Sequence, residues 1–232
     1  GSELSGLLRA LSTVPGDYWI RMFYCYPNSF TDEVLEVMAS DPRFCRYLDM
    51  PFQHISDPVL KKMNRKITRK EIEATMSRVR IKLPDVAWRT TFIVGFPTET
   101  DQDFEELVDF VSEGHFQHLG IFLYSDEDNI RSSKFGDPIP LSLKEERKNR
   151  LMEIQQKISR EHHQKMVGSL QQVLVGGFSS ETDLLLEGRN QYQGPEVDGV
   201  VYINEGNATS AGFHQVEITE AHEYDLVGKI LN

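Results

Sequence analysis

The sequence contains few cysteines and no long apolar segment. Its two cysteines, Cys25 and Cys45, are too few for a disulfide framework and too far apart for a local metal-binding motif. No apolar run approaches the roughly 20 residues that cross a bilayer, and no secretory signal pattern is present. We therefore expect a cytoplasmic globular protein in a reducing compartment, without a membrane partner.

Basic residues are scarce in the last third of the chain. From Gly168 onward there are two, Arg189 and Lys229, against ten acidic residues, a net charge of −8, whereas the whole chain carries −11. A small barrel that follows a nucleic-acid backbone needs a positive groove, so this composition disfavours a nucleic-acid partner. The alternative is that the acidic side chains simply form a solvated surface.

Strand-like and helix-like segments alternate up to Tyr124. Thr31, Thr68 and Thr100 are expected to cap amphipathic helices. This alternation predicts a parallel sheet with helices across it. Four such units do not close an eight-stranded barrel, so either the sheet is open or an upstream segment is missing. We favour a missing segment, because the sequence begins within a helical pattern. The expected strands are residues 18–24, 47–52, 88–94 and 119–123.

The sequence changes character after Tyr124. Residues 125–140 are rich in Asp, Ser, Gly and Pro and predict a loop, and Ser142 with Glu145 is expected to cap a long helix that ends before Gly168. Short strands then predict a small all-β barrel of the OB type. We expect an α/β domain over residues 1–140, a linker helix over 141–167 and the barrel over 168–232. Its strands are expected at residues 172–175, 184–187, 199–203, 215–219 and 226–231.

Gln53 and His54 directly follow one of the predicted parallel strands. Asp57 and Pro58 are expected to begin the next helix as its N-cap and first residue. In parallel α/β folds the carboxyl edge of the sheet carries the chemistry, so both side chains are candidates for a ligand site. The alternative is a turn in which they only satisfy backbone groups.

Two long motifs resemble those of the radical S-adenosylmethionine methylthiotransferases. The segment PFQHISDPVLKKMNR, residues 51–65, is similar to the family's P-x-Q-H-x-S-D-x-x-L-x-x-M-x-R signature. The segment RTTFIVGFPTETDQDFEEL, residues 89–107, resembles the family's fifth-strand motif, with Thr98 in place of the usual glycine. The long helix and small barrel resemble its linker and TRAM domain. The resemblance implies a partial parallel (βα) half-barrel followed by a TRAM barrel.

The resemblance also implies a cofactor and its contacts. Members of the family cleave S-adenosylmethionine to a 5′-deoxyadenosyl radical and install a methylthio group on an unactivated carbon. Arg89 and Thr91 alternate along one strand, so one pleat face can present both, and glycine at position 95 tolerates close approach of a ligand. For Arg89 and Tyr124 the alternative is a buried salt bridge or core packing. The expected cofactor-binding residues are Gln53, His54, Arg89, Thr91, Gly95, Phe96, Pro97, Tyr124 and Ser125.

One part of the family pattern is absent from this sequence. The family holds one [4Fe–4S] cluster with a C-x-x-x-C-x-x-C loop and a second in an upstream domain, and Cys25 and Cys45 match neither set. We therefore expect two clusters in the full-length relative and none in this chain, which is expected to be inactive alone. No metal ligands are predicted.

A third motif indicates the branch of the family. The segment GRNQYQGPEVDGVVYI, residues 188–203, is similar to that of the branch that modifies an aspartate of a small-subunit ribosomal protein. Glu196 and Asp198 lie in it and are the expected substrate contacts, with a basic ribosomal protein as partner. The alternatives are the same chemistry on tRNA, which the acidic barrel disfavours, and a non-enzymatic binding module.

Overall fold

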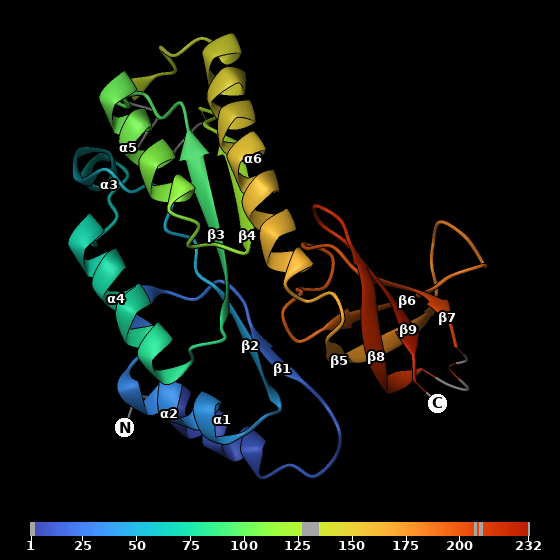
Figure 1. Cartoon of the computed structure of the whole chain (residues 1–232). Coiled ribbons are helices and arrows are strands. Elements are labelled where there is room, and N and C mark those ends of the chain that lie inside the picture. The colour runs from blue at the N-terminus through green and yellow to red at the C-terminus, as the bar shows by residue number, and fades with distance from the viewer. Residues whose placement is uncertain (1–2, 127–134, 207, 209–210, 232) are drawn as a thin grey trace. The chain divides into compact units, whose positions relative to one another are not determined.

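The computed structural model describes residues 3–126, 135–206, 208 and 211–231. The chain divides into two compact units, the first comprising residues 1–44 and 48–155 and the second comprising residues 45–47 and 156–232. Figure 1 shows a sheet with helices in the first unit and a barrel in the second. This arrangement confirms the predicted fold class, a parallel α/β layer followed by a small all-β barrel.

The first unit is built on a four-stranded parallel sheet with the order β1-β2-β3-β4. Its strands are β1 (Ile20–Met22), β2 (Phe44–Asp49), β3 (Ala87–Val94) and β4 (His118–Leu123). Its helices are α1 (Glu3–Ser12), α2 (Asp32–Ser40), α3 (Asp57–Lys62), α4 (Arg69–Lys82), α5 (Asp101–Ser112) and the first part of α6 (Leu141–Gln164), with a 3-10 turn η1 (Pro27–Ser29).

Three of the predicted helix caps are present. Thr31, Thr68 and Thr100 each accept a hydrogen bond from a backbone N–H in the first turn, and Thr68 and Thr100 form capping boxes with Glu71 and Asp103. These side chains satisfy N–H groups that have no partner within the helix. The local sequence therefore determines where these helices begin.

Two other predicted helix starts are wrong. Ser56, not Asp57, is the N-cap of α3, and Asp57 is its first helical residue. Helix α6 begins at Leu141, so Ser142 lies inside the helix and does not cap it. Part of the predicted loop 125–140 lies outside the described residues.

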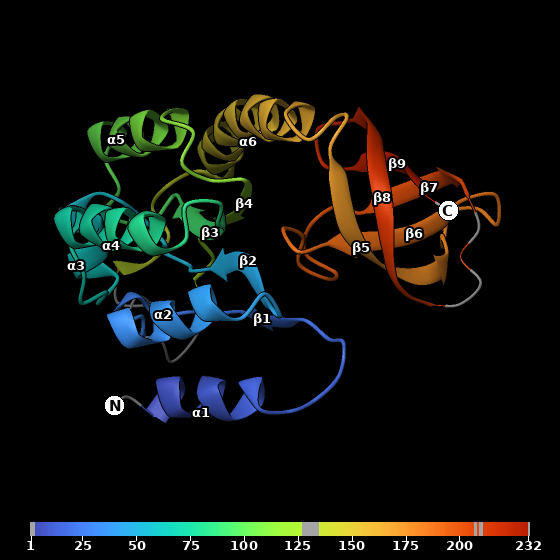
Figure 2. The same cartoon turned by 60° about the horizontal axis from the view of Figure 1, so that its bottom comes forward.

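The main core lies on one face of this sheet. Phe44, Leu48, Trp88 and Phe92 are buried there against apolar side chains of α2, α4 and α5, and Figure 2 shows these helices together on one side of the strands. Because successive residues of a strand point to opposite faces, Arg89 and Thr91 project from the other face of β3.

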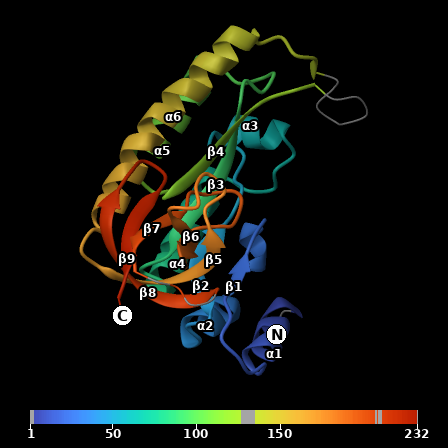
Figure 3. The ribbon, with the colours of Figure 1, turned by 90° about the vertical axis from the view of Figure 1, so that its right-hand side faces the viewer.

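The second unit is a closed barrel with the order β5-β6-β7-β9-β8. Its core is formed mainly by buried valine, isoleucine and leucine side chains. Figure 3 shows α6 as one continuous helix, which precedes these strands in the sequence. The strands are β5 (Leu170–Phe178), β6 (Leu186–Asn190), β7 (Val201–Glu205), β8 (Gly212–Ala221) and β9 (Leu226–Ile230).

Strand boundaries differ from the predictions in several places. Strand β2 covers residues 44–49 where 47–52 was predicted, although Met50 and Gln53 still donate backbone hydrogen bonds to β3. Strand β1 covers three residues where seven were predicted, and β6 begins two residues later than predicted. Among the described residues, no helix is both long and apolar enough to cross a bilayer.

Candidate functional site

Gln53 and His54 lie after β2 at the carboxyl edge of the sheet, as predicted. Gln53 continues the pairing with β3, donating its N–H to Thr91 O and accepting from Ile93 N, each at 2.9 Å. Its φ of 74° is unusual for a residue other than glycine. Backbone strain of this kind often occurs next to ligand sites, so Gln53 remains a candidate.

His54 is completely buried in this turn. Its Nδ1 accepts a hydrogen bond from the Ser56 N–H at 3.0 Å, so the ring satisfies a backbone group, as the alternative interpretation expected. Its Nε2 lies 3.7 Å from Oε2 of Glu99 and has no hydrogen-bond partner among the described residues. His54 therefore connects the first motif to the second, and its contact with a cofactor remains a prediction.

Glu99 is the centre of the buried network at this edge. Its Oε2 accepts hydrogen bonds from the backbone N–H groups of Gly95, at 2.9 Å, and Phe96, at 3.4 Å. Its Oε1 accepts from Nη1 of Arg147 in α6 at 2.7 Å, and Arg147 also donates to Asp101 at 2.6 Å. The carboxylate thus holds the loop after β3 in place and joins it to α6.

Gly95 is required for packing against α6. Its φ is +75°, and a Cβ built on it would overlap Cγ of Lys144. The Lys144 ammonium continues past Gly95 to donate to Tyr124 O at 2.8 Å and to Asp137 Oδ2 at 2.6 Å. The close approach that this glycine permits is therefore made by Lys144, and a ligand contact at Gly95 remains a prediction.

Aromatic rings pack around the same loop. Phe96 and Tyr124 are both buried, with ring centroids 5.3 Å apart in an edge-to-face arrangement. Phe135 also packs against Phe96, with ring centroids 6.1 Å apart. Core packing is thus the role of Phe96 and Tyr124 that the geometry supports directly. Pro97 is half-buried and Ser125 is exposed.

A polar group of side chains lies on the sheet face opposite the main core. Arg89 Nη1 donates to Oδ1 of the buried Asp49 at 2.9 Å, and the other carboxylate oxygen accepts from the Tyr24 N–H at 3.0 Å. Arg89 therefore forms the predicted alternative, a salt bridge. Thr91 lies opposite Gly120 of β4. Asp49, Arg89, Thr91 and Gly120 form what we call the inner-face group.

Two groups near this edge have shifted pKa values. Burial raises the pKa of the Cys25 thiol to about 12, with a further contribution from the negative charge of Asp49. For Asp103, burial opposes ionisation, but hydrogen bonds from Ser56 and Thr100 outweigh it and lower the pKa of the carboxyl. Asp103 is thus an anion that holds both the turn after His54 and the start of α5.

The thiols do not fit an iron–sulfur cluster. Cluster iron is held by thiolates at close loop spacing, whereas this sequence has two cysteines, Cys25 and Cys45, which lie far apart along the chain, and Cys45 is buried. Within residues 3–126, 135–206, 208 and 211–231, no three His, Cys, Asp or Glu side chains are grouped as metal ligands. The inner-face group fits S-adenosylmethionine better than it fits a cluster. It offers the guanidinium of Arg89, the hydroxyl of Thr91 and a position, Gly120, that has no side chain.

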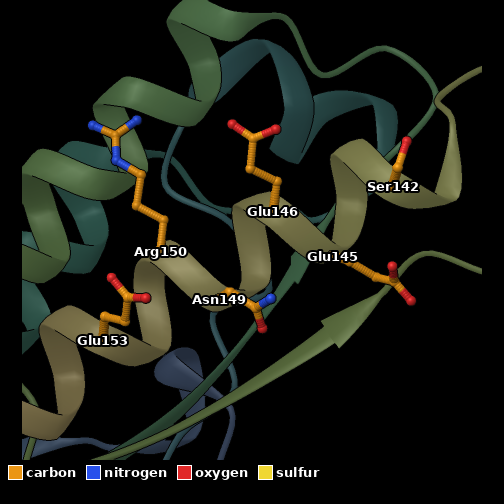
Figure 4. Close-up of a pocket in the computed structure, with 6 residues that line it drawn as sticks. All are labelled: Ser142, Glu145, Glu146, Asn149, Arg150 and Glu153. Carbon is orange, nitrogen blue, oxygen red and sulfur yellow. The ribbon is translucent and has the colours of Figure 1, made fainter.

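Two surface pockets lie outside these predicted residues. One, of about 500 Å³, runs along a single face of α6 and is lined by charged and polar side chains, as Figure 4 shows. Arg150, one of its lining residues, forms a bidentate salt bridge with Glu105 of α5. The other, of about 370 Å³, lies at the start of α5 beside Lys62 and Thr98. Neither pocket contains a sequence-predicted site residue.

Glu196 and Asp198 lie together in the loop between β6 and β7. Glu196 is exposed and has a φ of 65°. Asp198 is half-buried, and its Oδ2 accepts a hydrogen bond from the Gly194 N–H at 2.7 Å. Asp198 therefore has a structural role in the loop, and Glu196 is the better placed of the two for an external partner.

Sequence reasoning missed the residues that hold the site together. Asp49, Glu99 and Gly120 lie within or beside recognised segments, but only the folded sheet shows their contacts. Lys144 and Arg147 come from α6, which was interpreted only as a linker. Lys144 and Arg147 are three residues apart and so share one face of the helix. This spacing was the signal in the sequence that could have indicated a common role for them.

Comparisons with known proteins agree with this architecture. The model of the radical SAM superfamily matches residues 3–111, and that of the TRAM domain matches residues 167–231. A solved structure, coproporphyrinogen III oxidase (HemN) from Escherichia coli, aligns with 81% of this chain and 50% of its own, with a TM-score of 0.54 and 17% identity. At that identity it supports the fold alone.

Curated relatives are more similar in sequence. The ribosomal protein uS12 methylthiotransferase RimO of Bdellovibrio bacteriovorus is 48% identical over 97% of this chain and 49% of its own length. The proteins of the same name from Geobacter sulfurreducens and Myxococcus xanthus are 42% and 45% identical, each over 99% of this chain. The chain spans about half the length of these relatives. The chain therefore combines a radical SAM match and a TRAM match with similarity to methylthiotransferases over nearly its whole length.

Proposed function

We propose that this chain forms part of a methylthiotransferase that modifies an aspartate of a small-subunit ribosomal protein. The identity of 41–48% to several relatives named as ribosomal protein uS12 methylthiotransferases supports this assignment. The observation that carries it in the structure is the inner-face group. It combines Arg89, Asp49 and Thr91 on the face of the parallel sheet opposite the main core.

The proposed role of these residues is to bind and orient S-adenosylmethionine. The bound cofactor supplies the radical and methyl-transfer chemistry. Asp49 fixes the guanidinium of Arg89, and Thr91 adds a hydroxyl on the same face. A side chain held by a buried partner loses less freedom when a ligand binds, which favours affinity.

The network around Glu99 has a supporting role in this proposal. Glu99 and Arg147 hold the backbone at Gly95 and Phe96, and the packed rings of Phe96 and Tyr124 exclude water from that side. Gln53, His54, Pro97 and Ser125 complete the proposed cofactor environment at the strand ends. Exclusion of water strengthens electrostatic contacts inside a site and protects reactive species.

For the second unit we propose a basic ribosomal protein as partner. The net charge of −8 from Gly168 onward would steer a lysine- and arginine-rich protein toward the barrel. The same charge would forfeit the counterion release on which binding to tRNA depends. Exposed Glu196 is the proposed contact, because the Asp198 carboxylate is engaged with Gly194.

The test of the activity uses the longer protein that contains this chain. The isolated ribosomal protein is incubated anaerobically with the enzyme, S-adenosylmethionine, a one-electron reductant and a sulfide source, and mass spectrometry locates a methylthio group. Arg89→Met should abolish the product, whereas Arg150→Met, which removes only an exposed pair with Glu105, should not. Product on tRNA but not on the protein would overturn the assignment.

The test of the partner uses this chain and one charge reversal. Glu196→Lys should weaken binding to the ribosomal protein and reduce its dependence on salt. The matched control is Glu217→Lys, at a side chain that pairs with Lys229 within the barrel. Binding to tRNA at physiological salt as tight as to the basic protein would contradict the proposed partner.

A further inference from the structure

The contacts of His54 determine which of its two ring nitrogens carries the proton. Nδ1 lies 3.0 Å from the backbone nitrogen of Ser56. A backbone N–H can only donate, so Nδ1 must accept and has no proton of its own in this contact. The proton of the neutral ring is therefore on Nε2. The geometry thus selects one of the two neutral tautomers of His54.

The start of α5 keeps Ser56 in this position. The Ser56 hydroxyl donates a hydrogen bond to Oδ1 of Asp103. The other oxygen of Asp103 accepts from the backbone N–H of Thr100 at 2.9 Å and from its hydroxyl at 2.6 Å. His54 and Ser56 are both buried, so water does not compete for these groups. The acceptor role of Nδ1 is therefore held by two segments of the chain.

The Nε2–H group of His54 faces Oε2 of Glu99. The two atoms are 3.7 Å apart, slightly beyond hydrogen-bond distance, and both side chains are fully buried. Within the described residues Nε2 has no hydrogen-bond partner. A buried N–H without a partner is unfavourable, so the ring and the carboxylate attract each other. The other charged groups beside this contact are Asp103, which lies beyond Ser56, and Arg147, which holds Oε1 of Glu99.

The oxygen that His54 faces also holds the backbone of the loop after β3. Oε2 of Glu99 accepts hydrogen bonds from the N–H groups of Gly95, at 2.9 Å, and Phe96, at 3.4 Å. Arg147 fixes one end of the carboxylate through Oε1, and His54 restrains the other end. The position of Oε2 in turn sets where these two backbone N–H groups lie.

We propose that His54 is a positioning residue whose Nε2–H orients the Glu99 carboxylate. Through that carboxylate it fixes the backbone at Gly95 and Phe96. In this role His54 acts through Glu99 and not by contact with a ligand. The consequence for the cofactor rests on the proposed function, in which this loop adjoins S-adenosylmethionine, whereas the orientation itself is a property of this chain.

NMR of the imidazole nitrogens in the unaltered chain tests the tautomer. Long-range proton–nitrogen spectra distinguish a ring nitrogen that carries a proton from one that only accepts. At neutral pH we expect Nε2 of His54 to carry the proton and Nδ1 to be an acceptor. The Nε2 proton should exchange slowly with water, because the ring is buried. A proton on Nδ1, in a neutral or a doubly protonated ring, would overturn the proposal.

Two amide variants separate the roles of the two nitrogens. His54→Gln places an amide N–H near the position of Nε2, and His54→Asn places an amide oxygen near the position of Nδ1. We expect His54→Asn to speed hydrogen exchange of the Gly95 and Phe96 amides about tenfold or more. In His54→Gln this exchange should stay within about threefold of the unaltered chain. A side chain that only fills space would affect both variants alike.

His222→Asn is the control. Its Nε2 lies 3.9 Å from Oε2 of Glu220, but both side chains are exposed, so exchange at Gly95 and Phe96 should not change. Equal exchange at these amides in the two His54 variants would overturn the positioning role. If both variants unfold, the tautomer in the unaltered chain still decides. None of these measurements uses cofactor or product, so the positioning role and the proposed activity fail independently.

Discussion

Arg147 donates a hydrogen bond from Nη1 to Oε1 of Glu99 at 2.7 Å, although 48 residues separate them in sequence. Both side chains are almost fully buried. A charge buried in this way is tolerated because it is paired and hydrogen-bonded. This pair joins α6 to the loop after β3, so it should control the stability of the first unit.

Removing one partner of this pair should be costly. We expect Arg147→Met to lower the free energy of unfolding by about 3–5 kcal/mol, because Glu99 would remain buried without its cation. The measurement is urea denaturation. Arg150→Met, at the exposed pair with Glu105, is the control and should cost no more than about 1 kcal/mol. Similar losses in the two variants would show that burial does not set the difference.

Gly95→Ala should destabilise the chain more than Gly114→Ala. Both glycines have a positive φ, +75° and +73°, but only Gly95 faces Lys144, whereas nothing lies within 4 Å of a Cβ on Gly114. The shared backbone strain is about 1–2 kcal/mol, and overpacking at Gly95 should add about 1–3 kcal/mol. Thermal or urea unfolding gives both values. Equal losses would mean that Lys144 moves aside freely.

The Cys25 thiol should make stability depend on alkaline pH. Its pKa is raised from 9.0 to about 12 by burial and by the charge of Asp49. Between these values the unfolded chain loses the proton and the folded chain keeps it, so the unfolded state binds fewer protons. The free energy of unfolding should therefore fall as pH rises above 9, by at most about 1.4 kcal/mol per unit.

Cys25→Ala isolates this contribution. Lysine and tyrosine side chains titrate in the same range, but they are common to both chains, so the difference between the two pH profiles reports the thiol. We expect the variant to lose less stability than the unaltered chain above pH 9. Parallel profiles would contradict the proposed cause.

Iron–sulfur reconstitution of this chain should yield no four-iron cluster. Two cysteines far apart in sequence do not supply the set of closely spaced thiolates that a four-iron cluster requires. Iron analysis and visible absorbance after anaerobic reconstitution give the result, with a Cys25→Ala, Cys45→Ala double variant as the background. Near-stoichiometric iron in the unaltered chain alone would refute this expectation.

The sequence predicted the order of the elements well because local signals specify them. Thr68 with Glu71, and Thr100, mark helix starts through contacts within one turn. The apolar pattern around Trp88 predicted β3 to within one residue at its start. Boundaries were less certain at β2, where Met50 and Phe52 continue the apolar pattern after the regular strand has ended.

The site was predictable only in part, for a physical reason. Arg89 and Thr91 follow from alternation along a single strand. The role of Gly120 depends on the register between β3 and β4, and that of Lys144 depends on how α6 packs against Gly95. Such contacts join residues far apart in sequence, and no local pattern encodes them.

The two sheets differ in how much unpaired backbone they expose to another chain. The barrel is closed, so each of its strands has hydrogen-bonded neighbours on both sides. In the described part of the first unit, β1 is an outer strand, yet Ile20–Met22 is only three residues long. Short outer strands are poor templates for strand addition. Self-association through β1 would therefore bury little backbone, whereas β4 (His118–Leu123), the other outer strand of the described sheet, is six residues long and offers a longer edge.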